Sequence, residues 1–167
     1  MNGNFPVGPC FIRDYITGTQ GCQFVGRPDH DFYSRFSAAY NKPFALPESG
    51  AAYARNGTDT TLPGQVDELT MKQAWWRSIW AQAPAGNQVP SFPLLKMVVN
   101  FEEEKVEPVS LGSLGTVNQL NDYRIAANSS IANAFVTQSS QYAARLLWAT
   151  QLKYTCGGSV LITQSTP

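Results

Sequence analysis

Two short apolar segments on either side of one long helical pattern restrict the folds open to this chain. Residues 42–48 and 94–102 are mostly apolar and have the length of a strand. Residues 65–80 carry apolar side chains at helical intervals, with acidic residues near the start and Arg77 near the end, as a helix dipole favours. The order strand, helix, strand predicts a β-α-β unit with parallel strands and a right-handed crossover.

Two further helices are expected outside this unit. One begins near residue 29, where Asp29 or Asp31 can cap it, and Asn41 ends it. The other follows residue 128, with Ser129 or Ser130 as its cap. The stripes predicted for these helices are Phe32, Tyr33, Phe36 and Tyr40 in the first, and Ile131, Ala134, Phe135, Gln138, Tyr142 and Leu146 in the second.

The two ends of the chain carry weaker patterns. Residues 1–28 are predicted to be a Gly-rich loop with a short helix near Phe11 to Tyr15, and residues 151–167 form either a peripheral strand or a tail. Residues 29–150 between them form the α/β region. Because a parallel sheet of two strands cannot cover itself, the chain is expected to pack against partners or to belong to a larger α/β protein.

Composition fits a globular protein and argues against two classes of partner. Of 167 residues, 43% are hydrophobic and 14% are charged, which suits a folded domain. The 12 basic and 12 acidic side chains cancel, so no global field attracts nucleic acid or an anionic membrane surface. The longest apolar stretch, residues 94–101, is too short to cross a bilayer. We therefore expect neither a nucleic-acid nor a membrane partner.

The cysteines and two sequons suit a secreted protein. Cys10 and Cys22 lie in one loop and either form a disulfide or stay free, whereas Cys156 stands alone, and no CxxC pair suggests structural zinc. The tripeptides that begin at Asn56 and Asn128 match the N-glycosylation pattern, which also arises by chance. The first residues lack the features of a secretory signal, so this chain by itself has no export address, and the cysteines and sequons lead us to expect an extracellular location for a full-length parent protein.

Glu48 is the residue that most suggests chemistry. It ends the first predicted strand just before Gly50, and in parallel α/β folds the C-terminal strand ends form the active face. A carboxylate there is either catalytic or bound in a salt bridge to a neighbouring loop, and the local pattern leaves both open. Tyr53 and Phe101 lie beside the two strand ends and are candidate sugar-stacking rings.

The sequence has few of the residues that other kinds of catalytic or binding site require. His30 is the only histidine, which argues against a Ser-His-Asp triad or a His-rich metal site, and no nucleotide-binding glycine motif follows either strand. Trp75 and Trp76 can form a sugar platform, but their helical spacing favours a place in the core for Trp76. The acidic run of residues 102–104 either supplies a second catalytic carboxylate or forms a solvated loop face.

Four segments in a fixed order resemble one protein family. They are residues 42–53 (KPFALPESGAAY), 72–77 (KQAWWR), 95–105 with Phe101, Glu102 and Lys105, and 122–125 (DYRI). Together they resemble the C-terminal part of fungal secreted glycoside hydrolase-like proteins related to the family 26 β-mannanases, within the clan of retaining (β/α)8 enzymes. The likeness runs through roughly residues 5–148.

The resemblance implies both a fold and a function. The fold would be the C-terminal portion of a (β/α)8 TIM barrel, with about two strands and three helices of an incomplete barrel. Glu48 would be the catalytic nucleophile, and Tyr53, Phe101 and Glu102 would contact the substrate. That substrate would be a β-linked polysaccharide or oligosaccharide, such as mannan or a related hemicellulose, and no metal or organic cofactor is expected.

The chain departs from the family pattern in its catalytic pair. Relatives carry their acid/base glutamate at the end of the fourth strand, which this sequence does not include. With one carboxylate of the pair, the chain is expected to be a fragment that does not hydrolyse polysaccharide alone. Its unpaired strand edges favour self-association. The alternative is a non-catalytic carbohydrate-binding or interaction protein derived from a glycosidase barrel.

Overall fold

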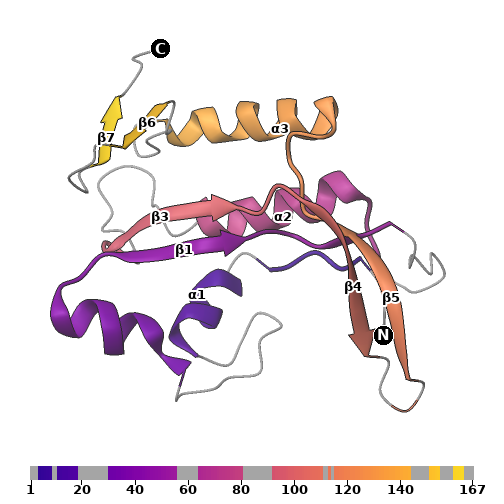
Figure 1. Cartoon of the computed structure of the whole chain (residues 1–167), viewed down its shortest axis with the longest axis horizontal. Helices are drawn as coiled ribbons and strands as arrows, with labels where there is room; N and C mark the ends of the chain where they lie inside the picture. The colour runs from indigo at the N-terminus through magenta and orange to yellow at the C-terminus, as the bar shows by residue number, and fades with distance from the viewer. Residues whose placement is uncertain are drawn as a thin grey trace.

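The described part of the chain is a mixed α/β structure, seen in a computed structural model (Figure 1). The structure describes residues 4–8, 11–18, 30–55, 64–80, 92–110, 113, 115–143, 151–154 and 160–163. Its strands form one parallel and two antiparallel sheets, and the described strands do not close into a barrel. The positions that lie outside the described residues include Cys10, Cys22, Asp29, Asn56, Leu146 and Cys156.

The predicted β-α-β unit is present. β1 (Phe44–Ser49) and β3 (Leu95–Asn100) form a parallel two-stranded sheet, and α2 (Glu68–Trp80) lies between them in the sequence. Their register shifts after Leu46, next to Pro47, which has no N–H to donate to the ladder. α2 begins later than residue 65 because the Oδ1 atom of Asp67 accepts a hydrogen bond from the backbone N–H of Thr70 at 2.7 Å.

The helical segment before β1 differs from its prediction. η2 (Tyr33–Ser37) has π-helical turns and η3 (Ala38–Tyr40) has 3-10 turns, and Asn41 ends the segment in the left-handed conformation, as expected. The predicted apolar face is wrong, since only Tyr33 of its four aromatic residues is buried. Neither π nor 3-10 turns repeat at the α-helical interval, so the other rings of the stripe do not follow Tyr33 into the core. The exposed rings are Phe32, Phe36 and Tyr40.

Asparagine and aspartate side chains cap the outer helices. The Oδ1 atom of Asp31 accepts a hydrogen bond from the backbone N–H of Ser34 at 3.0 Å, as expected of a cap. α3 (Ser129–Ser139) is capped by Asn128, whose Oδ1 atom accepts from the backbone N–H of Ser130 at 2.9 Å. The expectation that Ser129 or Ser130 would cap α3 is wrong, because both residues already belong to the helix. A short 3-10 turn, η5 (Ser140–Tyr142), follows α3.

α2 takes part in both hydrophobic clusters found among the described residues. The first cluster includes the buried side of α1 (Phe11–Thr17), the short helix expected near Phe11, and the second includes α3. Trp75 contacts the first cluster, whereas Trp76 and Trp80 belong to the second. The buried members are Ile12, Ile16, Tyr33 and Phe92 in the first cluster, and Trp76, Trp80, Ile125 and Ile131 in the second.

β3 is less buried than the sequence predicts. A strand covered on both faces was expected, but Met97, Val98 and Val99 are all exposed. Successive residues of a strand point to opposite faces, so exposure of three in a row means that neither face is fully covered. Among the described strands, β1 and β3 pair only with each other, and each therefore keeps one unpaired edge.

An antiparallel hairpin that the sequence did not predict follows β3. β4 (Glu104–Ser110) pairs with β5 (Thr116–Asp122) along its whole length, and β2 (Tyr53–Ala54) pairs with the end of β5. Figure 1 shows this hairpin extending from the end of β3 away from α3. A second pair, β6 (Gln151–Tyr154) and β7 (Val160–Thr163), lies in the terminal segment. No helix in the described ranges has the length and apolar character needed to span a membrane.

Candidate functional site

The C-terminal ends of β1 and β3 lie side by side. Ser49 pairs with Asn100, and the backbone N–H of Phe101 donates a hydrogen bond to the Ser49 carbonyl at 2.7 Å. Glu48 directly precedes Ser49 and is exposed. The structure therefore brings two predicted site residues, Glu48 and Phe101, to the same edge of the parallel sheet.

Phe101 belongs to a small aromatic and cationic group. Its ring centroid lies 5.1 Å from that of Tyr123, at an interplanar angle of 77°. The ammonium of Lys105 lies 4.4 Å from the Phe101 centroid and 5.6 Å from the Tyr123 centroid, which are cation-π distances. One face of the Phe101 ring is thus occupied by Lys105, so a sugar that stacks on this ring needs the opposite face.

Glu107 holds Lys105 and Tyr123 in place. One of its oxygens lies 3.0 Å from the Lys105 ammonium, and the other accepts hydrogen bonds from the Tyr123 hydroxyl and, at 2.6 Å, from the Asn121 amide. The hydrogen bonds from Tyr123 and Asn121, followed by that from Lys105, outweigh burial and lower the pKa of Glu107. An ionised Glu107 thus organises this side of the hairpin.

The turn after Glu48 is close to this group. A Cβ atom on Gly50 would lie 3.2 Å from Cδ1 of Tyr123, so the backbone there packs directly against the ring. Burial raises the pKa of Tyr123, with further contributions from the hydrogen bond and charge of Glu107 and from the charge of Glu48. The pKa of Lys105 is raised first by its hydrogen bond to Glu107, and also by neighbouring carboxylates that include Glu48. Glu48 is thus within electrostatic reach of Lys105 and Tyr123.

Cross-strand pairing divides the hairpin side chains between two faces. Paired residues share a face and successive residues alternate, so Lys105 and Asn121 lie on one face and Glu104 and Asp122 on the other. We term the first the polar face and the second the ionic face. The polar face carries Lys105, Glu107, Gln119, Asn121 and Tyr123, and the ionic face carries Glu104, Asp122 and Arg124.

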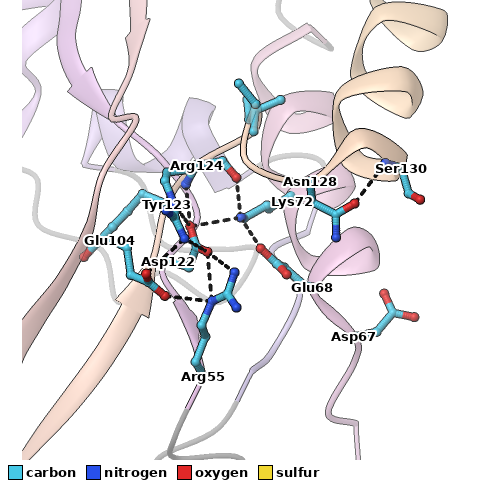
Figure 2. Close-up of polar contacts among 12 residues, drawn as sticks. Arg55, Asp67, Glu68, Lys72, Glu104, Asp122, Tyr123, Arg124, Asn128 and Ser130 are labelled. Atoms are coloured by element: carbon cyan, nitrogen blue, oxygen red, sulfur yellow. Dashed lines mark hydrogen bonds and ion pairs between the residues drawn. The ribbon is translucent and has the colours of Figure 1, made fainter.

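Asp122 is the centre of the ionic face (Figure 2). Its side chain is fully buried and accepts hydrogen bonds from Arg124 at 2.8 and 3.0 Å and from Nε of Arg55 at 2.9 Å. Both arginines also contact Glu104, at 2.9 and 3.0 Å. The ammonium of Lys72, on α2, lies 3.7 Å from Asp122. This network joins β4, β5, α2 and the residue that follows β2.

The charge balance of the ionic face suits a structural role. Burial opposes ionisation of Asp122, but the hydrogen bonds from Arg124 and Arg55 and the charge of Lys72 outweigh it and hold the pKa of Asp122 well below its usual range. Lys72 also donates hydrogen bonds to Glu68 and to the backbone carbonyl of Arg124. Because each charge already has partners within the chain, the network fastens the fold and has little capacity left for a ligand.

The carboxylate of Glu102 is also occupied by hydrogen bonds within the chain. Its carboxylate accepts hydrogen bonds from the backbone N–H groups of Ile125 and Ala126, at 3.0 and 3.1 Å, and from the amide of Asn100 at 2.6 Å. These bonds fix the segment that leads into α3. Substrate contact by Glu102 stays a prediction, and the geometry gives this residue a structural role first.

Tyr53 and Phe101 are not neighbours in a common site. Tyr53 pairs with Asp122 and therefore shares the ionic face of the sheet, whereas Lys105, which covers the Phe101 ring, lies on the polar face. The prediction that Trp76 is a core residue is confirmed, since its side chain is 2% exposed. Among the described residues, no three His, Cys, Asp or Glu side chains are grouped so that they could hold a metal ion.

Sequence reasoning missed the polar face. The apolar and polar alternation typical of a half-buried strand is absent at residues 118–123, where Asn118 and Asp122 are polar as well as Gln119 and Asn121. The acidic run at 102–104 also favoured a loop, since charge runs are typical of loops. The residues concerned are Lys105, Glu107, Gln119, Asn121 and Tyr123.

Comparison of the chain with models of known protein families, with curated proteins and with solved structures found no match in any of the three.

Proposed function

We propose that the chain is part of a retaining glycoside hydrolase-type domain that acts on β-linked polysaccharide, such as mannan or a related hemicellulose, with Glu48 as nucleophile. In this mechanism a carboxylate attacks the anomeric carbon while the glycosidic C–O bond breaks, and a second carboxyl group protonates the leaving oxygen. The observation that carries the proposal is the parallel β-α-β unit, which brings exposed Glu48 and the ring of Phe101 to adjacent strand ends. Catalytic residues of (β/α)8 enzymes occupy such strand ends.

The proposal extends to the fold of the complete domain. β1, α2 and β3 would be two neighbouring strands and the connecting helix of a (β/α)8 barrel. The exposed apolar side chains of Met97, Val98 and Val99 support this, because barrel strands are covered on both faces. In the chain alone, we expect these uncovered side chains and unpaired strand edges to cause self-association, which light scattering across a dilution series would detect.

A second catalytic carboxylate is not evident among the described acids near Glu48. Glu102 is bound to backbone N–H groups, Glu104 to two arginines, and Glu107 to Lys105, Tyr123 and Asn121. Of the predicted acidic run, only Glu103 has an exposed carboxylate without a hydrogen bond or ion pair in the described part of the chain, and no contact there places that carboxylate beside Glu48. As the family resemblance implies, we expect the acid/base group to come from outside the chain and the chain alone to be unable to hydrolyse polysaccharide.

An activated sugar tests Glu48 without needing the missing acid. A 2-deoxy-2-fluoro-β-mannosyl donor with a dinitrophenolate leaving group needs no protonation to react, and the fluorine slows hydrolysis of the glycosyl-enzyme. Incubation with this donor, protease digestion and mass spectrometry should find the fluorosugar on the peptide that contains Glu48. The Glu48→Gln variant should stay unlabelled, and Glu103→Gln, a change of another exposed acid, should label as the parent does.

Labelling and binding measured together distinguish a hydrolase-type domain from a non-catalytic carbohydrate-binding protein. Label that persists in Glu48→Gln, or label on another peptide, would show that Glu48 is not the nucleophile. If the chain took no label and affinity electrophoresis in mannan gels still retarded it, the non-catalytic carbohydrate-binding alternative would be favoured. The hydrogen bonds and ion pairs that occupy the carboxylates of Glu102, Glu104 and Glu107 are the observation that favours this alternative.

A further inference from the structure

The tripeptide Asn128-Ser129-Ser130 has the pattern of an N-glycosylation acceptor and stands at the beginning of α3. All three residues are exposed. The other sequon, at Asn56, lies outside the described residues. A sequon is only a pattern of sequence, so its use depends on whether the asparagine amide is accessible and free to react.

The oxygen and the nitrogen of the Asn128 amide differ in their hydrogen bonding. Its Oδ1 atom accepts the hydrogen bond from the backbone N–H of Ser130 at 2.9 Å and so caps α3. Figure 2 shows this contact as a dashed line, with the amide nitrogen directed away from it. Within the described part of the chain, Nδ2 of Asn128 donates no hydrogen bond. The cap therefore uses the oxygen and leaves the nitrogen available.

The backbone at Asn128 also suits an acceptor. Its φ and ψ of −123° and 121° are extended, so the residue lies outside the helical turn that it caps. The carbonyl of Asn128 accepts the first helical hydrogen bond, from the N–H of Ala132 at 2.9 Å. The backbone is thus anchored on its helical side, while the side chain projects from an exposed position.

We propose that Asn128 is an N-glycosylation site in the secreted protein. The donor is an oligosaccharide linked to a lipid diphosphate, and an oligosaccharyltransferase catalyses the step. A bond forms between Nδ2 and the anomeric carbon of the first sugar, and the bond from that carbon to the diphosphate oxygen breaks. The lipid diphosphate leaves, and Nδ2 gives one of its two protons to a base of the transferase.

The product is compatible with the folded chain. Glycosylation retains the amide carbonyl of Asn128, so the hydrogen bond from Ser130 that caps α3 is kept. A bulky glycan at this point requires that the beginning of α3 faces solvent in the mature protein. The proposal does not depend on Glu48 or on any hydrolase activity.

Three substitutions next to the cap give a matched test. Ser130→Ala removes the sequon hydroxyl, Ser129→Ala leaves the sequon intact, and Asn128→Asp removes the acceptor nitrogen. All three keep the hydrogen bond of the cap, because the donor is a backbone N–H and aspartate offers the same oxygen. Each is made in the full chain with Asn56→Gln, fused to a secretion leader and produced in yeast.

We expect peptide N-glycosidase F to reduce the mass of the Asn56→Gln chain and of its Ser129→Ala variant by one glycan. It should leave the Ser130→Ala and Asn128→Asp variants unchanged. Cell-free translation with microsomes gives a second readout that does not require a folded product, namely a mobility shift reversed by the glycosidase. If the Asn56→Gln chain carries no glycan in either system, or if the Ser130→Ala variant keeps one, the proposal is wrong.

Discussion

The ammonium of Lys72 lies 3.7 Å from a carboxylate oxygen of Asp122, and both side chains are buried. Lys72 belongs to α2 and Asp122 ends β5, so this pair fastens the hairpin to the helix of the β-α-β unit. Arg55 and Arg124 bind the same carboxylate. A buried carboxylate among three cations stabilises the fold only while it is charged.

Asp122→Asn should destabilise the chain strongly. The amide has no charge, so buried Lys72 and the two arginines lose most of the electrostatic attraction that compensates their desolvation. We expect the free energy of unfolding to fall by about 3 kcal/mol, the scale for breaking a buried ion pair. Urea unfolding at neutral pH, followed by tryptophan fluorescence, measures this loss. Glu103→Gln, at an exposed acid, should change stability by less than about 0.5 kcal/mol.

The same carboxylate should govern stability in acid. The folded pKa of Asp122 lies below the ordinary aspartate value, so its contribution is present above about pH 4 and is lost as the pH falls further towards the folded pKa. The parent chain should therefore lose more unfolding free energy than Asp122→Asn when the pH is lowered from about 5 to about 3. Equal losses in the two proteins would show that Asp122 is not the titrating group.

Tyr123→Phe should change stability on the alkaline side. Burial and then the hydrogen bond and charge of Glu107 raise the folded pKa of Tyr123 above its usual value of about 10. The linked stabilisation is therefore complete below about pH 10 and is lost as the pH rises towards the higher folded pKa. Urea unfolding from about pH 8 to about pH 11 should show a shallower decline for Tyr123→Phe than for the parent.

A surface tyrosine provides the control for this titration. Tyr40 is 68% exposed, and Tyr40→Phe should keep the alkaline decline of the parent chain. At neutral pH, Tyr123→Phe should cost about 1 kcal/mol, because Glu107 keeps its contacts with Asn121 and Lys105. If Tyr40→Phe flattened the decline and Tyr123→Phe did not, the assignment to Tyr123 would be wrong.

The β-α-β unit could be predicted because its signals are local. The apolar runs have strand length, the intervening helix repeats at its own period, and Asp67 sits where a cap is needed. Glu48 and Phe101 could be placed together for the same reason, since parallel strands bring their C-terminal ends to one edge. Nothing beyond the order of the elements was required for that prediction.

The hairpin, with its polar face and its ionic face, depends on contacts between residues that are distant in the sequence. Glu102 and Glu104 look alike as parts of an acidic run, yet one binds backbone N–H groups near α3 and the other binds arginines on the ionic face. The sequence cannot distinguish these partners, because Arg55 and Ile125 come near them only after the hairpin has paired. The burial of Phe32, Phe36 and Tyr40 was mispredicted because an α-helical period was assumed where the turns are π-helical in η2 and 3-10 in η3.

Gly50→Ala should disturb Tyr123 directly. The added Cβ would lie 3.2 Å from Cδ1 and 3.5 Å from Cβ of Tyr123, so the ring must move by a few tenths of an ångström. We expect a loss of about 1 kcal/mol, at the lower end for overpacking, with a change in the tyrosine signal of the near-UV circular dichroism.

Gly115→Ala separates crowding from backbone strain. Gly115 has a φ of 93° and open space around its Cβ position, so alanine there is strained but touches nothing. It should reduce stability without altering the signal of Tyr123. In a Tyr123→Ala background, the cost of Gly50→Ala should largely disappear, and an unchanged cost would show that contact with the ring is not its cause.

Trp76 should behave as a core residue and not as a sugar platform. Its ring is 2% exposed and lies 5.1 Å from that of Phe135, and its indole N–H donates to Gln138 at 2.9 Å. Trp76→Ala should cost about 3–5 kcal/mol through the cavity it leaves, whereas Trp76→Phe should cost about 1–2 kcal/mol because it keeps a ring and loses the hydrogen bond. Urea unfolding measures both variants, and affinity electrophoresis in mannan gels tests whether the Phe variant still binds as the parent does. Near-parent stability of Trp76→Ala together with lost mannan retardation would instead identify Trp76 as a binding surface.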